Sequence, residues 1–145
     1  MNWRDQGDGP HWLPALNAAE IKYGIPTDLL ARIAFQECSF RRAVINGQVK
    51  SPAGATGLMQ LMPQYYPNAG KNTLADIDTA AQLLANLYKR FHDWQTAVAA
   101  YNDGGGNVDM VLQGLRVLPL ETRNYVADVF ADVSVPSAHS SVLNA

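Results

Sequence analysis

The chain has 145 residues, of which 48% are hydrophobic and 17% are charged, so it is large enough to fold as one domain around a core and too apolar to be wholly disordered. Its net charge of −2 leaves no basic footprint for nucleic acid or for an anionic membrane surface. No apolar run reaches the length of a transmembrane helix, so stable insertion into a membrane is not expected.

Cysteine and histidine usage predicts neither a disulfide nor a metal site. Cys38 is the single cysteine, and the three histidines are scattered without Cys or His neighbours at ligand spacing. We therefore expect no metal and no other cofactor. Residues 1–10 are polar and lack the apolar core of a signal peptide, so we expect the chain to be made without an export signal of its own.

The first third of the chain is expected to form an arm and two helices. Residues 1–10 fit an extended or frayed arm. The apolar pattern predicts a helix from Pro14 to Tyr23, with Gly24 as its stop. A second helix is expected after Thr27, whose hydroxyl can cap its N-terminus, while Asp28 favours the positive end of the helix dipole.

Glu37 completes one face of this second helix. The other members of the face lie seven, four and three positions earlier and are apolar: Leu30, Ile33 and Ala34. Burial disfavours the charged form of a carboxyl and raises its pKa, which lets a glutamate hold a proton near neutral pH and donate it to a leaving group. The segment alone also fits a glutamate that turns to solvent, or one that pairs with Arg41 or Arg42.

Beyond Phe40 the sequence predicts one small hairpin and a series of helices. Asn46-Gly47 stands between two short β-branched runs, which favours a β-hairpin. Residues 57–62 are expected as a short helix ended by Pro63. Asp76 is a plausible cap for the next and longest helix. The remaining helices are expected at 76–94, 95–101, 107–115 and 121–133, and residues 134–145 are expected to form a flexible tail. The sequence thus predicts a predominantly helical α+β domain over residues 11–133.

Four short motifs follow one another in the chain: Gln36–Phe40, Pro52–Pro63, Ala100–Asn102 before a glycine run, and Pro119–Val126. In this order they resemble the successive motifs of the soluble lytic transglycosylase domain, and the resemblance spans roughly residues 11–130. It implies a lysozyme-like fold with the hairpin beside an active-site cleft. It also implies cleavage of the β-1,4 bond between N-acetylmuramic acid and N-acetylglucosamine in peptidoglycan.

The family's catalytic acid maps onto Glu37. In such enzymes one carboxyl first protonates the glycosidic oxygen and then acts as base on the muramyl C6 hydroxyl, which attacks C1 and closes a 1,6-anhydro ring. No second catalytic carboxylate is required, in contrast to the two-carboxylate scheme of ordinary glycosidases.

Five further positions match residues of the family's cleft. Tyr101 matches the tyrosine that donates to the catalytic Glu, although a buried tyrosine bonded to a backbone carbonyl fits as well. Met59 and Gln60 match the cleft wall, where a thioether can pack on a sugar face and an amide can hydrogen-bond the substrate. Asn102 could hold a sugar or cap a turn. Tyr125 could line the cleft, and both it and Met59 also fit plain core packing.

The sequence departs from the family after the catalytic acid and in the linker that follows. Cys38 occupies the position where the family usually has Ser, and Ser39 follows; both remain candidate substrate contacts. A thiol is a weaker donor than a hydroxyl, and no His motif accompanies Cys38, so we do not expect it to act as a nucleophile. The separation between Glu37 and Gly57 is also longer than is usual in the family.

Asp103 stands where the family commonly has Ala after the Tyr-Asn pair. A carboxylate near the cleft could serve as the second group of a hydrolytic lysozyme, or it could simply open a glycine turn in solvent. A peptidoglycan-binding virion or structural component without catalysis is a further alternative. We expect a monomer that acts on peptidoglycan glycan strands, with no nucleic acid partner.

A bacteriophage origin fits a short wall-degrading domain without an export signal. Such a protein would pass from the host cytoplasm to the periplasm and cell wall with the help of a holin, or would be carried by the virion. A bacterial enzyme fits the sequence equally.

Overall fold

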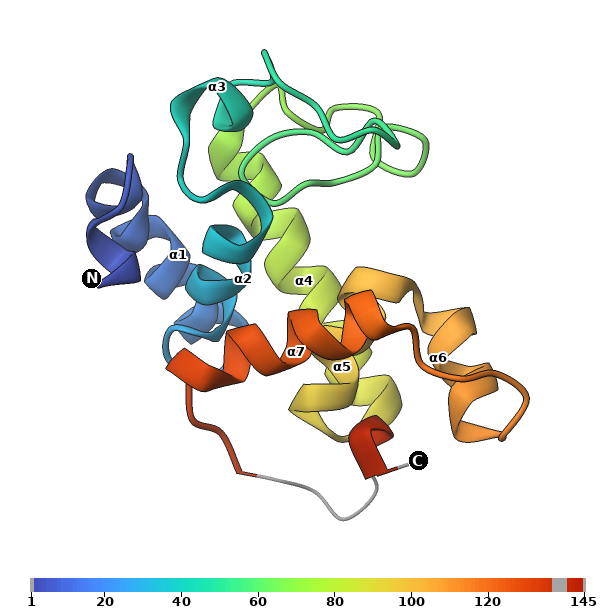
Figure 1. Cartoon of the computed structure of the whole chain (residues 1–145). Helices are drawn as coiled ribbons and strands as arrows, with labels where there is room; N and C mark the ends of the chain where they lie inside the picture. The colour runs from blue at the N-terminus through green and yellow to red at the C-terminus, as the bar shows by residue number, and fades with distance from the viewer. Residues whose placement is uncertain (1, 137–140, 145) are drawn as a thin grey trace. The chain divides into compact units, whose positions relative to one another are not determined.

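The computed structural model describes residues 2–136 and 141–144, and this part of the chain is predominantly helical, as the sequence predicts (Figure 1). It divides into two compact units, Met1–Gln82 and Leu83–Ala145, with the boundary inside the long helix α4 (Thr73–Phe91). Within the described residues, no helix combines the length and the hydropathy that crossing a bilayer requires.

The first unit is built on two packed helices and a long irregular segment. Its other elements are η1 (Trp3–Asp5), α1 (Gly9–Tyr23), α2 (Leu29–Cys38) and α3 (Arg42–Ile45). α1 packs against both α2 and η1. The core between them contains fully buried aliphatic side chains from both helices: Leu16, Leu29, Leu30 and Ile33. As predicted, α1 ends at Gly24, whose left-handed conformation (φ 69°) suits a residue without a Cβ.

The first residues are not the frayed arm that the sequence suggests. Trp3 is 7% exposed, and its ring lies 6.0 Å from the ring centroid of Phe35 and 6.5 Å from that of Phe40. Arg4 covers the outer side of the indole, with its guanidinium carbon 4.5 Å from the ring centroid. Aromatic partners on and after α2 therefore hold a segment whose own composition looks polar.

The β-hairpin predicted at Asn46-Gly47 is not confirmed. Val44 and Ile45 belong instead to the short helix α3, and the amide of Gly47 donates to the carbonyl of Val44 in the turn that ends it. The side chains of Val44 and Ile45 are both buried, so these two β-branched residues pack in the core from a helical turn. Among the described residues the only strand-like pairing is one isolated antiparallel bridge between Thr56 and Leu61.

Among its described residues, the second unit contains three further α-helices. They are α5 (Trp94–Asp103), α6 (Gly105–Leu112) and α7 (Leu120–Asp132), and α5 packs against both of the others. Each lies within a few residues of its predicted position. Asp93 caps α5 by accepting from the amide of Thr96 at 2.9 Å.

Residues 141–144, at the end of the predicted flexible tail, pack against other parts of the second unit. Ser141 and Val142 are buried, and the amide of Val142 donates to the hydroxyl of Thr96 on α5 at 2.9 Å. Residues 142–144 form the short helix η2, which contacts α5 and α6. The rest of the predicted tail includes residues 137–140 and 145, which lie outside the described part.

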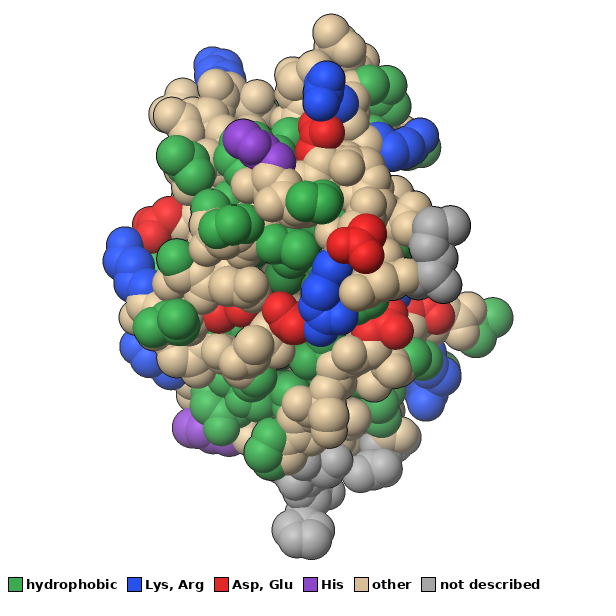
Figure 2. All heavy atoms as spheres, turned by 90° about the vertical axis from the view of Figure 1, so that its left-hand side faces the viewer, with side chains coloured by type: hydrophobic (Ala, Val, Ile, Leu, Met, Phe, Trp, Pro, Cys, Tyr) green, Lys and Arg blue, Asp and Glu red, His purple; other side chains and the backbone are tan. Residues whose placement is uncertain are grey.

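Acidic and basic side chains lie beside one another on the molecular face in Figure 2, with no extended patch of either sign on that face. Close ion pairs join Arg42 to Asp8 and Lys22 to Asp78, at 3.0 and 2.9 Å. These pairs are largely exposed, so each is expected to contribute little to stability.

Candidate active site

Glu37 lies in the last turn of α2, where the predicted stripe leaves the core. The three apolar members of the stripe are fully buried, whereas Glu37 itself is half-buried. The helix ends one residue later, at Cys38, because Ser39 and Phe40 both adopt left-handed backbone conformations with φ 53°. The amide of Ser39 closes the end by donating to the carbonyl of Phe35 at 2.8 Å. The carboxyl therefore stands at a fixed helix end.

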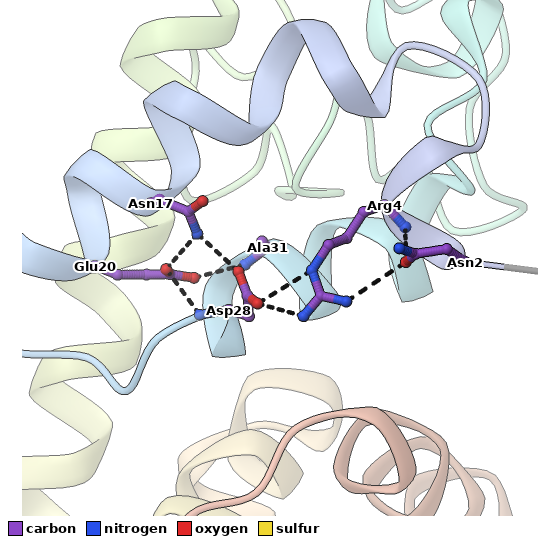
Figure 3. A network of polar contacts seen from close by, with 6 residues as sticks. All are labelled: Asn2, Arg4, Asn17, Glu20, Asp28 and Ala31. Atoms are coloured by element: carbon purple, nitrogen blue, oxygen red, sulfur yellow. Dashed lines mark hydrogen bonds and ion pairs between the residues drawn. The ribbon is translucent and has the colours of Figure 1, made fainter.

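The other end of α2 is capped from α1. The carboxylate of Glu20 accepts from the backbone amides of Asp28 and Ala31, at 2.9 and 3.0 Å (Figure 3). Thr27, the cap predicted from the sequence, is exposed and does not make this contact, and Asp28 occupies the cap position at φ 69° without a side-chain cap bond. A buried acid eight or more residues upstream thus replaces the local cap.

Asp28 links this cap to the N-terminal segment. Its carboxylate accepts from the Asn17 amide at 2.9 Å and forms an ion pair with Arg4 (Figure 3). The same Asn17 amide donates to Glu20 at 2.7 Å. Burial raises the pKa of Glu20, and the hydrogen bonds from the two backbone amides and Asn17 oppose that shift. The sequence holds a signal for this role, because Glu20 lies four residues after the buried Leu16 on the inner face of α1.

Cys38 and Ser39 follow the acid but face different surroundings. Cys38 is 2% exposed, and its thiol donates back to the carbonyl of Ala34 at 3.1 Å. Burial raises the pKa of the thiol to about 12, so it stays protonated at neutral pH. Ser39 is exposed at the helix end. Of these two candidate substrate contacts, only Ser39 therefore presents its side chain to solvent.

Residues 57–60 form turns rather than the predicted short helix. Thr56 and Leu61, on either side, exchange backbone hydrogen bonds of 3.1 Å each, which closes the segment into a compact loop. Gln60 adopts φ 52° and donates through Nε2 to the carbonyl of Gly57 at 2.9 Å. Met59 is fully buried and Gln60 is half-buried. The amide of Gln60 is thus the more accessible of the two matched side chains.

Asp76, in the first turn of α4, stabilises this loop. It is 4% exposed in the first turn of α4, and its Oδ2 accepts from the amide of Gly70 at 2.9 Å. A Cβ on Gly57, whose φ is 83°, would stand 2.6 Å from the same oxygen. The loop therefore approaches the carboxylate as closely as a glycine allows. Asp76 was expected as the cap of α4, but Asn72 takes that role by accepting from the amide of Ala75 at 3.0 Å.

The remaining candidates lie in the second unit. Tyr101 and Asn102 are half-buried in the last turn of α5, and Tyr125 is 7% exposed on α7. The hydroxyl of Thr122 donates to Oδ1 of Asn102 at 2.8 Å, which joins α7 to the end of α5. Glu37, Met59 and Gln60 belong to the first unit, so their assembly with Tyr101 into one site stays a prediction.

Asp103 is held by an ion pair. Both oxygens of its carboxylate contact the guanidinium of Arg116, one of them at 3.2 Å, and the Asp103 side chain is 11% exposed. This contact raises the pKa of Arg116. The backbone carbonyl of Asp103 accepts from the Asn107 amide at 2.8 Å. The guanidinium thus binds both oxygens of the one carboxylate that the hydrolytic alternative would use.

The sequence pattern of the family described as "Transglycosylase SLT domain" matches residues 14–115, well over half of the chain. The chain belongs to this family. The match covers the Glu37, Met59–Gln60 and Tyr101–Asn102 segments and ends before Tyr125. Among the described residues of this SLT domain, no group of three or more His, Cys, Asp or Glu side chains could hold a metal ion.

Two relatives extend the comparison. The SLT domain is 33% identical, over 97 residues, to a protein named "Transglycosylase" from Enterobacteria phage PRD1. Its fold matches the crystal structure of an inactive glutamate-to-glutamine mutant of the lytic transglycosylase Slt from Pseudomonas aeruginosa, with a TM-score of 0.64 and 25% identity. These matches cover 64% and 82% of this chain, but only 35% of the phage protein and 22% of the Pseudomonas protein.

Proposed function

We propose that this chain is a peptidoglycan lytic transglycosylase. It cleaves the β-1,4 bond between N-acetylmuramic acid and N-acetylglucosamine and leaves a 1,6-anhydro end on the muramic acid. The observation that carries the proposal is the placement of Glu37, a half-exposed carboxyl at the end of a helix whose apolar face is otherwise fully buried, within a domain of the SLT family. The inactive Pseudomonas relative, which has a glutamine in place of a glutamate, supports a glutamate in the central role.

In this mechanism Glu37 acts twice. Its carboxyl protonates the glycosidic oxygen as the bond to C1 breaks, and the resulting carboxylate then takes the proton of the C6 hydroxyl, whose oxygen attacks C1. The proton that Glu37 gives away is thus replaced, and water does not enter the product. Tyr101 orients the carboxyl, Gln60 and Asn102 donate to the substrate, and Ser39 offers a hydroxyl beside the acid. Met59 and Tyr125, both buried, shape the wall behind them.

The ion pair between Asp103 and Arg116 weighs against the hydrolytic alternative, because a lysozyme of the two-carboxylate type needs a second carboxylate that can reach water or the sugar. A protein that binds peptidoglycan without cutting it is the other alternative.

The mass of the products separates these functions. Purified cell walls digested with the chain should yield muropeptides with anhydromuramyl ends, whereas a hydrolase yields ends heavier by one water. Glu37→Gln should lower lysis by at least about 100-fold, the usual contribution of a general acid. Asp5→Asn, which changes an exposed acid in η1 outside the four family motifs, is the matched control and should keep full activity. If the Glu37→Gln protein lysed cell walls as fast as the native sequence, the mechanism would be refuted.

The phage relative supports a role in phage lysis or entry, with the cell wall or periplasm of the host as the site of action. Immunoblots of purified particles and of host lysates would distinguish a virion component from a lysis enzyme. A monomer suffices for the mechanism, since one chain contains every matched residue.

A further inference from the structure

The first unit has a cavity of about 300 Å³ that none of the candidate catalytic residues lines. It lies between the loop after Leu61 and the first turns of α4. Its polar and aromatic lining comes from six side chains: Tyr65, Tyr66, Asn68, Asn72, Asp76 and Thr79. The volume stands at the lower end of the range for small-molecule sites, which favours a ligand of one or two rings.

The cavity wall is ordered before any ligand arrives. The amides of Tyr65 and Tyr66 both donate to the carbonyl of Met62, at 3.0 and 2.9 Å, and the amide of Ala69 donates to the carbonyl of Tyr66 at 2.9 Å. Asp76 then holds the end of the loop through the amide of Gly70. Because these turns fix the loop, a ligand would not have to order it on binding.

The lining combines an exposed aromatic ring with amide groups. Tyr65 is 70% exposed at the rim, so its ring can contact a ligand that enters the cavity. Asn68 is exposed beside it, and Asn72 uses its Oδ1 to cap α4, which leaves its Nδ2 to donate to a ligand. Among the described residues that line the cavity there is no lysine, arginine or histidine, which argues against a phosphate or carboxylate ligand.

We propose that this cavity is an auxiliary saccharide site that binds an N-acetylated amino sugar of the glycan strand, apart from the catalytic cleft. A pyranose has an apolar C–H face that can stack on Tyr65, and hydroxyl and acetamido groups that the two asparagines can hydrogen-bond. The identity of the strand rests on the proposed function, while the sugar chemistry rests on the cavity itself.

Binding without cleavage tests the site. In a Glu37→Gln background, Tyr65→Ala should weaken binding of a β-1,4-linked N-acetylglucosamine trimer and retention on insoluble cell walls by at least fivefold. Because Tyr65 is mostly exposed, its removal should not unfold the chain. Ile21→Ala is the matched control, since Ile21 is 84% exposed in the same unit and outside the cavity. Equal binding by the Tyr65→Ala and Ile21→Ala proteins would overturn the proposal.

Competition and activity give two further readouts. The trimer should displace the chain from cell walls, whereas displacement by free stem peptide alone would make the cavity a peptide site and overturn the proposal. With Glu37 intact, Tyr65→Ala should slow digestion of whole walls but not of a short soluble fragment. If Glu37→Gln kept full lysis, the proposed function would fail, yet the trimer comparison between Tyr65→Ala and Ile21→Ala would still decide on the saccharide site.

Discussion

Cys38 directly follows Glu37, and its surroundings explain how a thiol is accommodated beside the candidate catalytic acid. The side chain is 2% exposed and bonds to the carbonyl of its own helix, so it acts as a small buried group. With a pKa raised to about 12, it contains almost no thiolate at neutral pH. We predict that an aromatic disulfide reagent at pH 7.5 modifies native Cys38 at least about 100-fold more slowly than the urea-unfolded chain. Rapid labelling of the native protein would contradict this burial.

Asp103 gives a second prediction at the same scale. Asp103→Asn removes one partner of the contact with Arg116, which should lower the free energy of unfolding by about 1 kcal/mol, since the pair is only partly buried. The variant should give products with the same mass as those of the native sequence, because the proposed mechanism does not use this carboxylate. Urea unfolding and product mass check the two parts. If the Asp103→Asn protein folded normally but no longer cleaved peptidoglycan, Asp103 would have to be a catalytic residue.

At the scale of the element, the cap on α2 is the contact that fixes the helix bearing Glu37. Glu20→Ala removes the acceptor of the buried amide of Ala31 and of the partly buried amide of Asp28, so we predict a loss of about 2–3 kcal/mol in the free energy of unfolding. Glu121→Ala removes an exposed glutamate from the first turn of α7 and should change stability by less than about 1 kcal/mol. A similar effect of both substitutions would refute the capping role.

The loop of residues 57–60 depends on the close approach of Gly57 to Asp76. Gly57→Ala adds both a backbone strain at φ 83° and a Cβ that would stand 2.6 Å from Oδ2 of Asp76. Gly54→Ala is the matched control, because Gly54 has a similar φ of 94° but open space around it. We predict that Gly57→Ala lowers the free energy of unfolding by about 1–3 kcal/mol more than Gly54→Ala does, as measured by urea denaturation. Equal costs would mean that the contact with Asp76 does not constrain the loop.

The sequence predicted those elements whose signal is local. The period of apolar residues locates α4, α5 and α7, and it also places Glu37 at the end of α2. The matched motifs supply the other candidate site residues. The spacing of apolar residues along the chain does not predict contacts between residues that are distant in sequence. The cap on α2 comes from Glu20 rather than Thr27, and Asn46-Gly47 follows a helical turn because Val44 and Ile45 are buried there. Likewise, residues 57–60 cannot continue a helix while Gln60 is left-handed.

Over the whole molecule, the buried acids share one kind of position. Among the described residues three carboxyl side chains are buried, and they belong to Glu20, Asp76 and Asp93. Glu20 caps α2, Asp93 caps α5, and Asp76 lies in the first turn of α4. Backbone amides point out of the starts of α2 and α5, so Glu20 and Asp93 gain hydrogen bonds there that partly offset the loss of water. Asp76 instead accepts from the loop amide of Gly70. Other acids pair with cations nearer the surface, as Asp78 does with Lys22 and Asp8 does with Arg42.

These two environments predict opposite effects of pH on stability. Burial raises the pKa of Asp76, so between its ordinary value of 3.8 and the raised value the folded chain binds more protons than the unfolded one. The stability that Asp76 contributes is therefore complete below pH 3.8 and is lost as the pH rises through the native pKa. Hydrogen bonds from Lys22 and Tyr23 lower the pKa of Asp78, whose contribution is present above pH 3.8 and is lost as the pH falls through its native value.

Asp76→Asn and Asp78→Asn form a matched pair on the same helix that isolates these effects. Asn at position 76 can still accept from the amide of Gly70, so the fold should persist. We predict that, between pH 3 and pH 7, the stability of the native sequence falls relative to Asp76→Asn and rises relative to Asp78→Asn as the pH increases. Urea unfolding of the three proteins at a series of pH values measures both differences. The two stability differences should change with pH in opposite directions. If both changed in the same direction, the assignment of Asp76 to a desolvated site and of Asp78 to an exposed ion pair would be contradicted.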